Sequence, residues 1–141
     1  MTGRFPYGKL VKYPHLSPED EFVWERFIDD NPTAYKTCDY DVALGDIETL
    51  RQTADALGIA GAERVNQYRI DIVGYRDTDI HLIEVKKRAT LGTLSEVEEK
   101  TSMFNRDKAP DKPTKSVIIA GDITPELDEI AKKRGIILIV I

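Results

Sequence analysis

Three charged residues lie inside two apolar, β-branched runs within residues 69–87. Asp71 interrupts the first run, and Glu84 and Lys86 interrupt the second. Four polar residues, 76–79, separate the two runs, so the pattern is typical of a β-hairpin. In a hairpin the two carboxylates lie on neighbouring strands, with Lys86 roughly 6 to 7 Å along from Glu84 on the same face. Charges on a half-buried sheet face are costly unless they neutralise one another or hold a cation.

Two carboxylates beside an ammonium are the groups needed to hydrolyse a phosphodiester bond. The carboxylates of Asp71 and Glu84 provide hard oxygen ligands for Mg²⁺ or Mn²⁺, which polarises a phosphate and helps to generate hydroxide. The Lys86 ammonium stabilises the charge that develops on the nucleophile or the phosphate. A structural ion-pair network without metal is the alternative. The acid-x-Lys spacing by itself is weak evidence, because residues 98–100 repeat it outside any apolar strand.

Ile70-Asp71 followed by Glu84-Val85-Lys86 resembles the signature of the PD-(D/E)XK nuclease superfamily, an Asp on one strand and Glu-x-Lys on the next. Ile70 stands where the family has proline. The surrounding residues look most like small Holliday-junction-resolvase-like nucleases and compact phage or viral nucleases. The resemblance is local and covers about 40 residues around the two strands.

This resemblance implies a restriction-endonuclease-like α/β fold, a three-layer sandwich with a central mixed β-sheet flanked by helices. It implies Mg²⁺ or Mn²⁺ as the cofactor, bound by Asp71, Glu84 and the Val85 carbonyl, with Lys86 positioning or activating water. The expected activity is therefore metal-dependent cleavage of nucleic acid, DNA more than RNA. The alternative is a binding or structural module with the same fold and no turnover, such as a phage or virus component.

Ser17-Pro18 predicts the start of a helix that runs to about Asp30, because Ser is a good N-cap and Pro suits the first helical position. Glu21 lies at the edge of the apolar stripe of this helix, and Glu25 lies one turn on, further toward solvent. Family members often complete the metal site with a Glu from this helix. The resemblance thus makes Glu21 a fourth catalytic candidate, with Glu25 in reserve; two acids on an exposed face are the alternative.

The chain divides into an irregular N-terminal arm, residues 1–16, and a single domain, residues 17–141. Alternating apolar residues predict a strand within 33–44, and helical spacing predicts an inserted helix at about 46–58. The nearly all-β-branched segment 136–141 predicts an interior strand buried on both faces, and it is far too short to cross a membrane.

The Ser95–Glu98 capping box predicts a further helix running to about residue 106. The resemblance makes Lys100 the nearest equivalent of a polar helper that many family members carry on this helix. A loop rich in Lys and Arg follows. The candidate nucleic-acid contacts are Lys87, Arg88, Lys100, Arg106 and Lys108. The alternative is that these side chains are simply solvated.

The 141-residue chain carries a net charge of −5, which argues against one broad nucleic-acid surface. Most of the excess acid lies in the segment 19–30. We expect a homodimer that pools two sets of basic segments around one nucleic acid, with no membrane partner. The single Cys38 favours a reducing, cytoplasmic location, since it has no internal disulfide partner.

Overall fold

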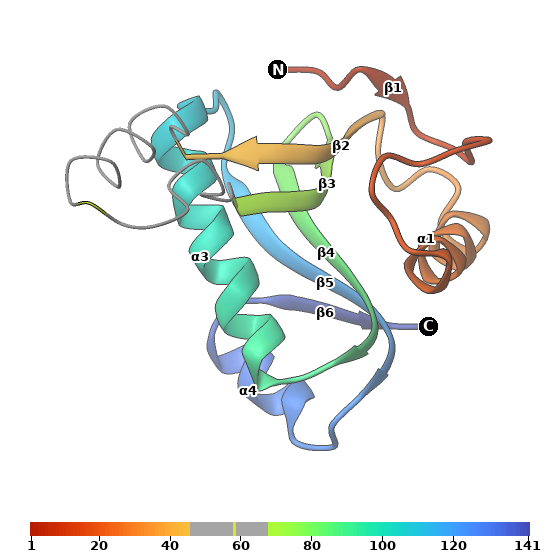
Figure 1. Ribbon diagram of the computed structural model, residues 1–141, viewed down its shortest axis with the longest axis vertical. Helices are drawn as coiled ribbons and strands as arrows, with labels where there is room; N and C mark the ends of the chain where they lie inside the picture. Colours follow the sequence, from red (N-terminus) through yellow and green to blue (C-terminus); the bar gives the residue numbers. More distant parts are fainter. Residues whose placement is uncertain (46–57, 59–67) are drawn as a thin grey trace.

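The computed structural model describes residues 1–45, 58 and 68–141, and its centre is a mixed β-sheet (Figure 1). Within the described residues six strands lie side by side in sequence order. The strands are β1 (Phe5–Pro6), β2 (Thr37–Leu44), β3 (Tyr68–Tyr75), β4 (Ile80–Ala89), β5 (Thr114–Ile123) and β6 (Ile137–Val140). The pairs from β1 to β4 are antiparallel, and β4–β5 and β5–β6 are parallel.

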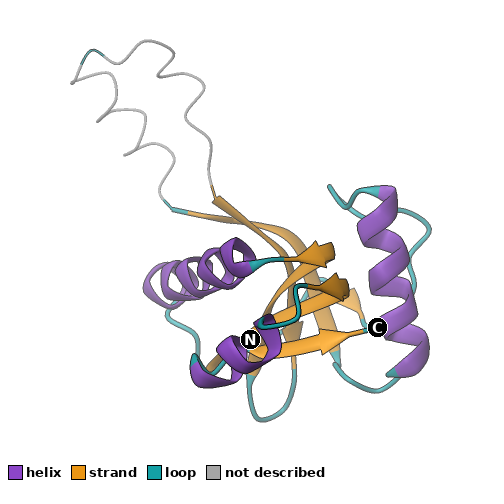
Figure 2. Ribbon diagram, turned by 90° about the horizontal axis from the view of Figure 1, so that it is seen from below, coloured by secondary structure: helices purple, strands orange, loops and turns teal. Residues whose placement is uncertain are grey.

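Helices cover both faces of this sheet (Figures 1 and 2). These helices are α1 (Pro18–Asp30), α3 (Leu91–Lys108) and α4 (Leu127–Lys133). Trp24 and Phe27 of α1 pack on one face, and Leu94 and Val97 of α3 pack on the other, together with α4. The predicted α/β fold, a central mixed sheet flanked by helices, is confirmed. No helix in the described part of the chain is long and apolar enough to cross a membrane.

The hairpin and the first helix form as the sequence predicts. Residues 76–79 are the turn between β3 and β4, where the Arg76 N–H donates to the Asp79 carbonyl at 3.0 Å. Ser17 caps α1 by accepting a hydrogen bond from the Asp20 N–H at 3.1 Å, and Pro18 opens the helix. Trp24 of α1 is fully buried, and its indole N–H donates to the Tyr40 hydroxyl. This contact ties α1 to β2.

Three predicted elements differ from the structure, and a fourth lies largely outside the described residues. The helix α3 begins at Leu91 rather than at Ser95, because Thr90 and Thr93 form the capping box. The strand β6 is an edge strand with Val140 half exposed, so the interior position predicted for 136–141 is wrong. Two residues of the arm form β1 and pair with β2. The predicted helix at 46–58 lies outside the described residues except for Gly58, which is in a turn.

Gly74 sits where β3 passes directly beneath the ring of Tyr35. A Cβ added there would lie 2.6 Å from two carbons of that ring. We therefore expect Gly74→Ala to displace Tyr35, whose hydroxyl is hydrogen-bonded to His81 Nδ1, and to destabilise the protein by roughly 1–3 kcal/mol. Thermal unfolding measures this. Gly92→Ala is the control, because its nearest neighbour would be 3.6 Å away, and it should cause no loss. Equal melting temperatures for both variants would contradict the packing described.

Candidate functional site

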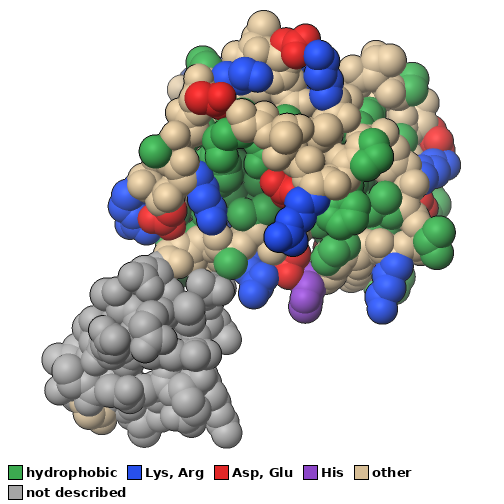
Figure 3. Space-filling model, turned by 90° about the horizontal axis from the view of Figure 1, so that it is seen from above, with side chains coloured by type: hydrophobic (Ala, Val, Ile, Leu, Met, Phe, Trp, Pro, Cys, Tyr) green, Lys and Arg blue, Asp and Glu red, His purple; other side chains and the backbone are tan. Residues whose placement is uncertain are grey.

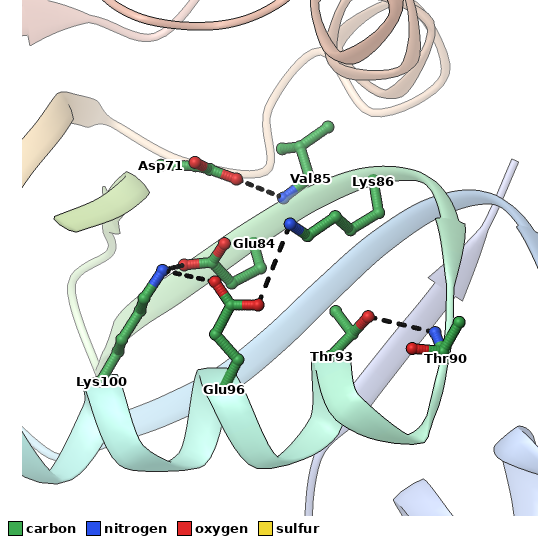
Figure 4. Close-up of polar contacts among 8 residues, drawn as sticks. All are labelled: Asp71, Glu84, Val85, Lys86, Thr90, Thr93, Glu96 and Lys100. Carbon is green, nitrogen blue, oxygen red and sulfur yellow. Dashed lines mark hydrogen bonds and ion pairs between the residues drawn. The ribbon is translucent and has the colours of Figure 1, made fainter. Parts of the chain in front are cut away.

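The candidate site lies where β3 and β4 separate. Their pairing ends at Ile72 and Ile83, so the next residues, Asp71 and Glu84, stand opposite each other without a backbone pair. The Asp71 carboxylate fills the opening and accepts a hydrogen bond from the Val85 N–H at 3.0 Å (Figure 4). Because the N–H and C=O of one strand residue point toward the same neighbouring strand, the Val85 carbonyl faces the same opening.

On β2, Asp41 lies opposite Asp71 in the register of the two strands. Its φ is 52°, a left-handed conformation that non-glycine residues seldom adopt. Tyr40 and Ile72 pack under α1, whereas Val42 and Ile70 pack with Phe104 of α3. The residues on the two sides of Asp41 in β2 therefore face opposite sides of the sheet, and so do the residues on the two sides of Asp71 in β3.

Glu84 is almost completely buried, with 1% of the residue exposed. The pKa of its carboxyl is raised from 4.5 to about 8, because burial and the negative charge of Asp71 both raise it, against the opposing effect of Lys100. Two carboxyl groups that crowd each other in this way hold a proton between them at neutral pH. A divalent cation relieves the same crowding by replacing the proton.

Two lysines border the carboxyl pair (Figure 4). The buried Lys100 ammonium lies 3.0 Å from Glu84 and 2.8 Å from Glu96, one turn earlier on α3. Lys86 is one-third exposed, and its ammonium lies 3.9 Å from the second oxygen of Glu96. Glu96 thus links the two ammonium groups. Lys86 is the more accessible of the two and can contact a molecule in the site, whereas Lys100 holds Glu84 from behind.

Among the acids of α1, Asp20 interacts electrostatically with this site, and the role expected for Glu21 stays a prediction. Burial raises the pKa of Asp20, the nearby charge of Asp71 also raises it, and Lys86 opposes the shift. Glu21 instead contributes to the raised pKa of Tyr13, and Glu25 accepts a hydrogen bond from the Tyr13 hydroxyl. In the sequence, Asp20 lies three residues after the Ser17 N-cap, a position where an acid is typical of a capping box.

The donor set suits a hard divalent ion that keeps part of its water shell. Within residues 1–45, 58 and 68–141, no three Asp, Glu, His or Cys side chains form a metal site by themselves. Asp71, Glu84 and the Val85 carbonyl provide three oxygens at one opening, and Mg²⁺ is commonly held by one or two carboxylates with water completing the octahedron. These residues fit the Mg²⁺ or Mn²⁺ site that the sequence predicts.

The predicted nucleic-acid contacts occupy different environments. Lys100 is 8% exposed and lies inside the site, so it is not a surface contact. Three others form exposed ion pairs, Lys87 with Glu19, Arg88 with Asp122 and Arg106 with Asp107. Lys108 is exposed at the end of α3. Figure 3 shows acidic side chains interspersed with Lys and Arg rather than one uniform basic surface.

We expect Glu84→Gln to stabilise the metal-free protein at high pH. The folded-state pKa of Glu84 lies above the unfolded value, so its contribution to stability is complete below about pH 4.5 and is lost as the pH rises through about 8. Gln carries no charge to bury. The melting temperature measured with chelator above pH 8 should rise by roughly 3 °C or more, corresponding to about 1 kcal/mol.

The exposed Glu99→Gln variant is the control for this change, and it should melt like the wild type at every pH. The gain of Glu84→Gln should also shrink as the pH falls toward 4.5, because Glu84 is protonated in both states well below that pH. A Glu84→Gln protein without any gain above pH 8 would show that the carboxyl pair is not crowded.

Comparison with known proteins supports the fold. No protein-family model matches the sequence, and no curated protein matches it. The chain is similar to a chain in the solved structure of the EndoMS–dsDNA2 complex, with a TM-score of 0.50 and 15% sequence identity. The similarity covers 95% of this chain and 48% of the EndoMS chain, so this chain spans about half the length of that one. At this identity the similarity shows a shared fold.

Proposed function

We propose that this protein is a divalent-metal-dependent nuclease of the PD-(D/E)XK type that hydrolyses phosphodiester bonds in DNA. The observation that carries the proposal is the carboxyl pair of buried Glu84 and half-buried Asp71 at the break between β3 and β4, with the Lys86 ammonium beside it. A purely structural role leaves this arrangement unexplained, because apolar residues would fill a sheet interior at lower cost.

Each residue of the site has a distinct role in this proposal. Asp71 and Glu84 hold Mg²⁺ or Mn²⁺ together with the Val85 carbonyl, and the Val85 N–H keeps the Asp71 carboxylate in place. When bound, the ion supplies Lewis acidity to the phosphate and lowers the pKa of water. Lys86 orients the attacking water and stabilises the negative charge on the phosphate. Lys100 holds Glu84 in position.

Asp20 takes the place proposed for an acid from the first helix. Its charge interacts with both Asp71 and Lys86, which are the two sides of the site. If the site held a divalent ion, Asp20 would accept hydrogen bonds from water beside Asp71 and Lys86. Glu21, the candidate from the sequence, remains a less favourable choice.

DNA is the proposed substrate because the similar chain of EndoMS was solved with double-stranded DNA. The chain's net charge of −5 leaves little positive surface on one copy. We therefore propose that the active form is a homodimer, in which two copies combine their basic side chains around one nucleic acid.

The experiment is a cleavage screen with the purified full chain. Branched, single-stranded and duplex DNA, and matching RNA, are incubated with Mg²⁺, with Mn²⁺ and with chelator. We expect cleavage of at least one DNA substrate with either metal and none with chelator. Binding of a nucleic acid or protein without cleavage in any metal would favour the alternative, a binding module with a nuclease-like fold.

A further inference from the structure

A groove of about 600 Å³ lies along the outer edge of β2, between the N-terminal arm and the end of α3. Arg4 and His15 of the arm and Lys108 of α3 contribute to its walls. The strand β1 pairs with β2 only at Thr37 and Cys38. Beyond Cys38, no strand in the described part of the chain covers this edge, so the groove is open.

Both acids of the groove have hydrogen-bond or ion-pair partners, whereas two of its cations form no ion pair with a described residue. Asp39 accepts hydrogen bonds from the Tyr75 hydroxyl and the Arg4 backbone N–H, each at 2.8 Å. Asp41 pairs with Arg69 at 2.9 Å. The side chains of Arg4 and Lys108 form no ion pair with any described residue. Arg4 and Lys108 are therefore available to an anionic ligand that enters the groove.

Strained backbone shapes the inner end of this groove. His15 and Asp41 have φ values of 56° and 52°, and the His15 Nε2 lies 3.3 Å from the Asp41 carboxylate. Each left-handed non-glycine residue costs free energy, and such residues cluster at binding sites and active sites. The fold thus retains strain at the point where the arm meets β2.

The groove leads to the candidate site across neighbouring strands. The pairs Tyr40–Ile72 and Val42–Ile70 bracket Asp41 and Asp71, so these two acids are register neighbours on β2 and β3. Neighbouring strands lie about 5 Å apart, and one DNA strand advances about 3.4 Å per nucleotide along the helix axis. A DNA strand with one phosphate at Asp71 therefore reaches the groove within a few nucleotides.

The segment from His15 to Asp20, which leads into α1, also runs from the groove toward the candidate site. His15 contacts Asp41 on β2, and five residues later Asp20 interacts with Asp71 on β3. The two contacts run in the same direction across the sheet, from the groove to the candidate site. The groove and the site therefore lie at neighbouring positions of the sheet.

We propose that this groove binds the phosphate backbone of the DNA strand next to the cleaved bond, with Arg4 and Lys108 contacting phosphates and His15 at the boundary with the site. This inference rests on the proposed function and adds a substrate-binding surface to it. The volume of the groove lies within the range of small-ligand pockets and accommodates a nucleotide.

The test measures binding of a fluorescent DNA duplex to the full chain in Ca²⁺, which occupies oxygen sites without supporting efficient cleavage. Each phosphate contact contributes about 0.9 to the slope of log affinity against log salt. Arg4→Ala and Lys108→Ala should each lower that slope by about one, and the double variant by about two. When salt rises from about 50 to 200 mM, the affinity of each single variant should therefore fall about threefold less than the affinity of the wild type. Lys12→Ala is the control, because Lys12 is exposed on the same arm outside the groove.

The outcomes separate this inference from the proposed function. Wild-type cleavage with slopes that Arg4→Ala and Lys108→Ala leave unchanged would overturn the groove and keep the nuclease. A slope lowered equally by Lys12→Ala would also overturn it, since any surface charge would then suffice. Lowered slopes for the two groove variants alone, without cleavage by the wild type, would support the groove and overturn the catalytic role. A wild type that binds no DNA would overturn both.

Discussion

Lys86→Ala is expected to slow DNA cleavage at least roughly 10²-fold while metal and DNA still bind, because one preorganised electrostatic contact is lost. The Lys86 side chain is one-third exposed, and its ammonium lies as far as 3.9 Å from the Glu96 carboxylate oxygen with which it pairs. The ammonium is therefore available to a phosphate. The metal ligands Asp71 and Glu84 are held by other contacts, with Val85 and Lys100. Single-turnover cleavage in Mg²⁺ measures the rate, and calorimetric titration with Mn²⁺ measures metal binding.

Lys87→Ala is the matched control for Lys86→Ala. Lys87 is the next residue along β4, and its exposed side chain pairs with Glu19 at 3.4 Å rather than pointing into the site. We expect a small effect on the cleavage rate and a modest weakening of DNA binding. If Lys86→Ala cleaves as fast as the wild type, or if both variants lose the same activity, Lys86 is not a catalytic residue.

Asp71→Asn is expected to have the largest effect, a weaker metal affinity and a rate lower by roughly 10³-fold. A metal ion supplies several kcal/mol of transition-state stabilisation, and this is lost when the ion is not held. Asn retains a carbonyl oxygen that can accept the Val85 N–H, so the fold should persist. Calorimetric titration with Mn²⁺, together with the cleavage rate at increasing Mg²⁺, measures both effects.

High concentrations of Mg²⁺ should restore part of the activity of Asp71→Asn, because the remaining ligands still bind the ion weakly. Asp122→Asn serves as the control, since Asp122 forms an exposed pair with Arg88 away from the carboxyl pair. A variant Asp71→Asn with normal Mn²⁺ affinity would show that Asp71 is not a metal ligand.

The sequence predicts the hairpin around Asp71 and Glu84 well, because strand alternation and turn chemistry are local. The runs around Asp71 and Glu84 have the spacing of a hairpin, and the structure pairs them in the register that places the two carboxyls opposite each other. Sequence alone does not show that the strands separate at this point. That separation follows from Asp71 replacing a backbone partner of Val85, which is a tertiary contact.

The parts of the site supplied by helices were harder to predict. Helix α3 starts one turn earlier than its clearest capping signal, and the burial of Lys100 depends on how the helix packs over Glu84. Asp20 is assigned to the N-cap region by sequence, yet its charge interacts with Asp71 across the interface between α1 and the sheet. Rotation of a helix about its axis determines which of several neighbouring acids faces the site, and periodicity fixes that rotation only coarsely.

The groove at β2 was not predicted because its residues are distant in sequence. Arg4, Asp41 and Lys108 come from the arm, a strand and the end of a helix, and only the fold brings them together. His15 offered no partner in the sequence, since Asp41 lies 26 positions later. The left-handed backbone conformations of His15 and Asp41 are likewise a consequence of tertiary structure.

The most direct test of the central claim is the location of Mn²⁺ in crystals of the full chain, determined by anomalous scattering. We predict a peak in the opening between β3 and β4, about 2.1 Å from carboxylate oxygens of Asp71 and Glu84 and from the Val85 carbonyl. The same crystals of Asp71→Asn should show a weaker peak or none. An opening without Mn²⁺ at concentrations that support cleavage, or Mn²⁺ bound only at other acids, would contradict the assignment of this site.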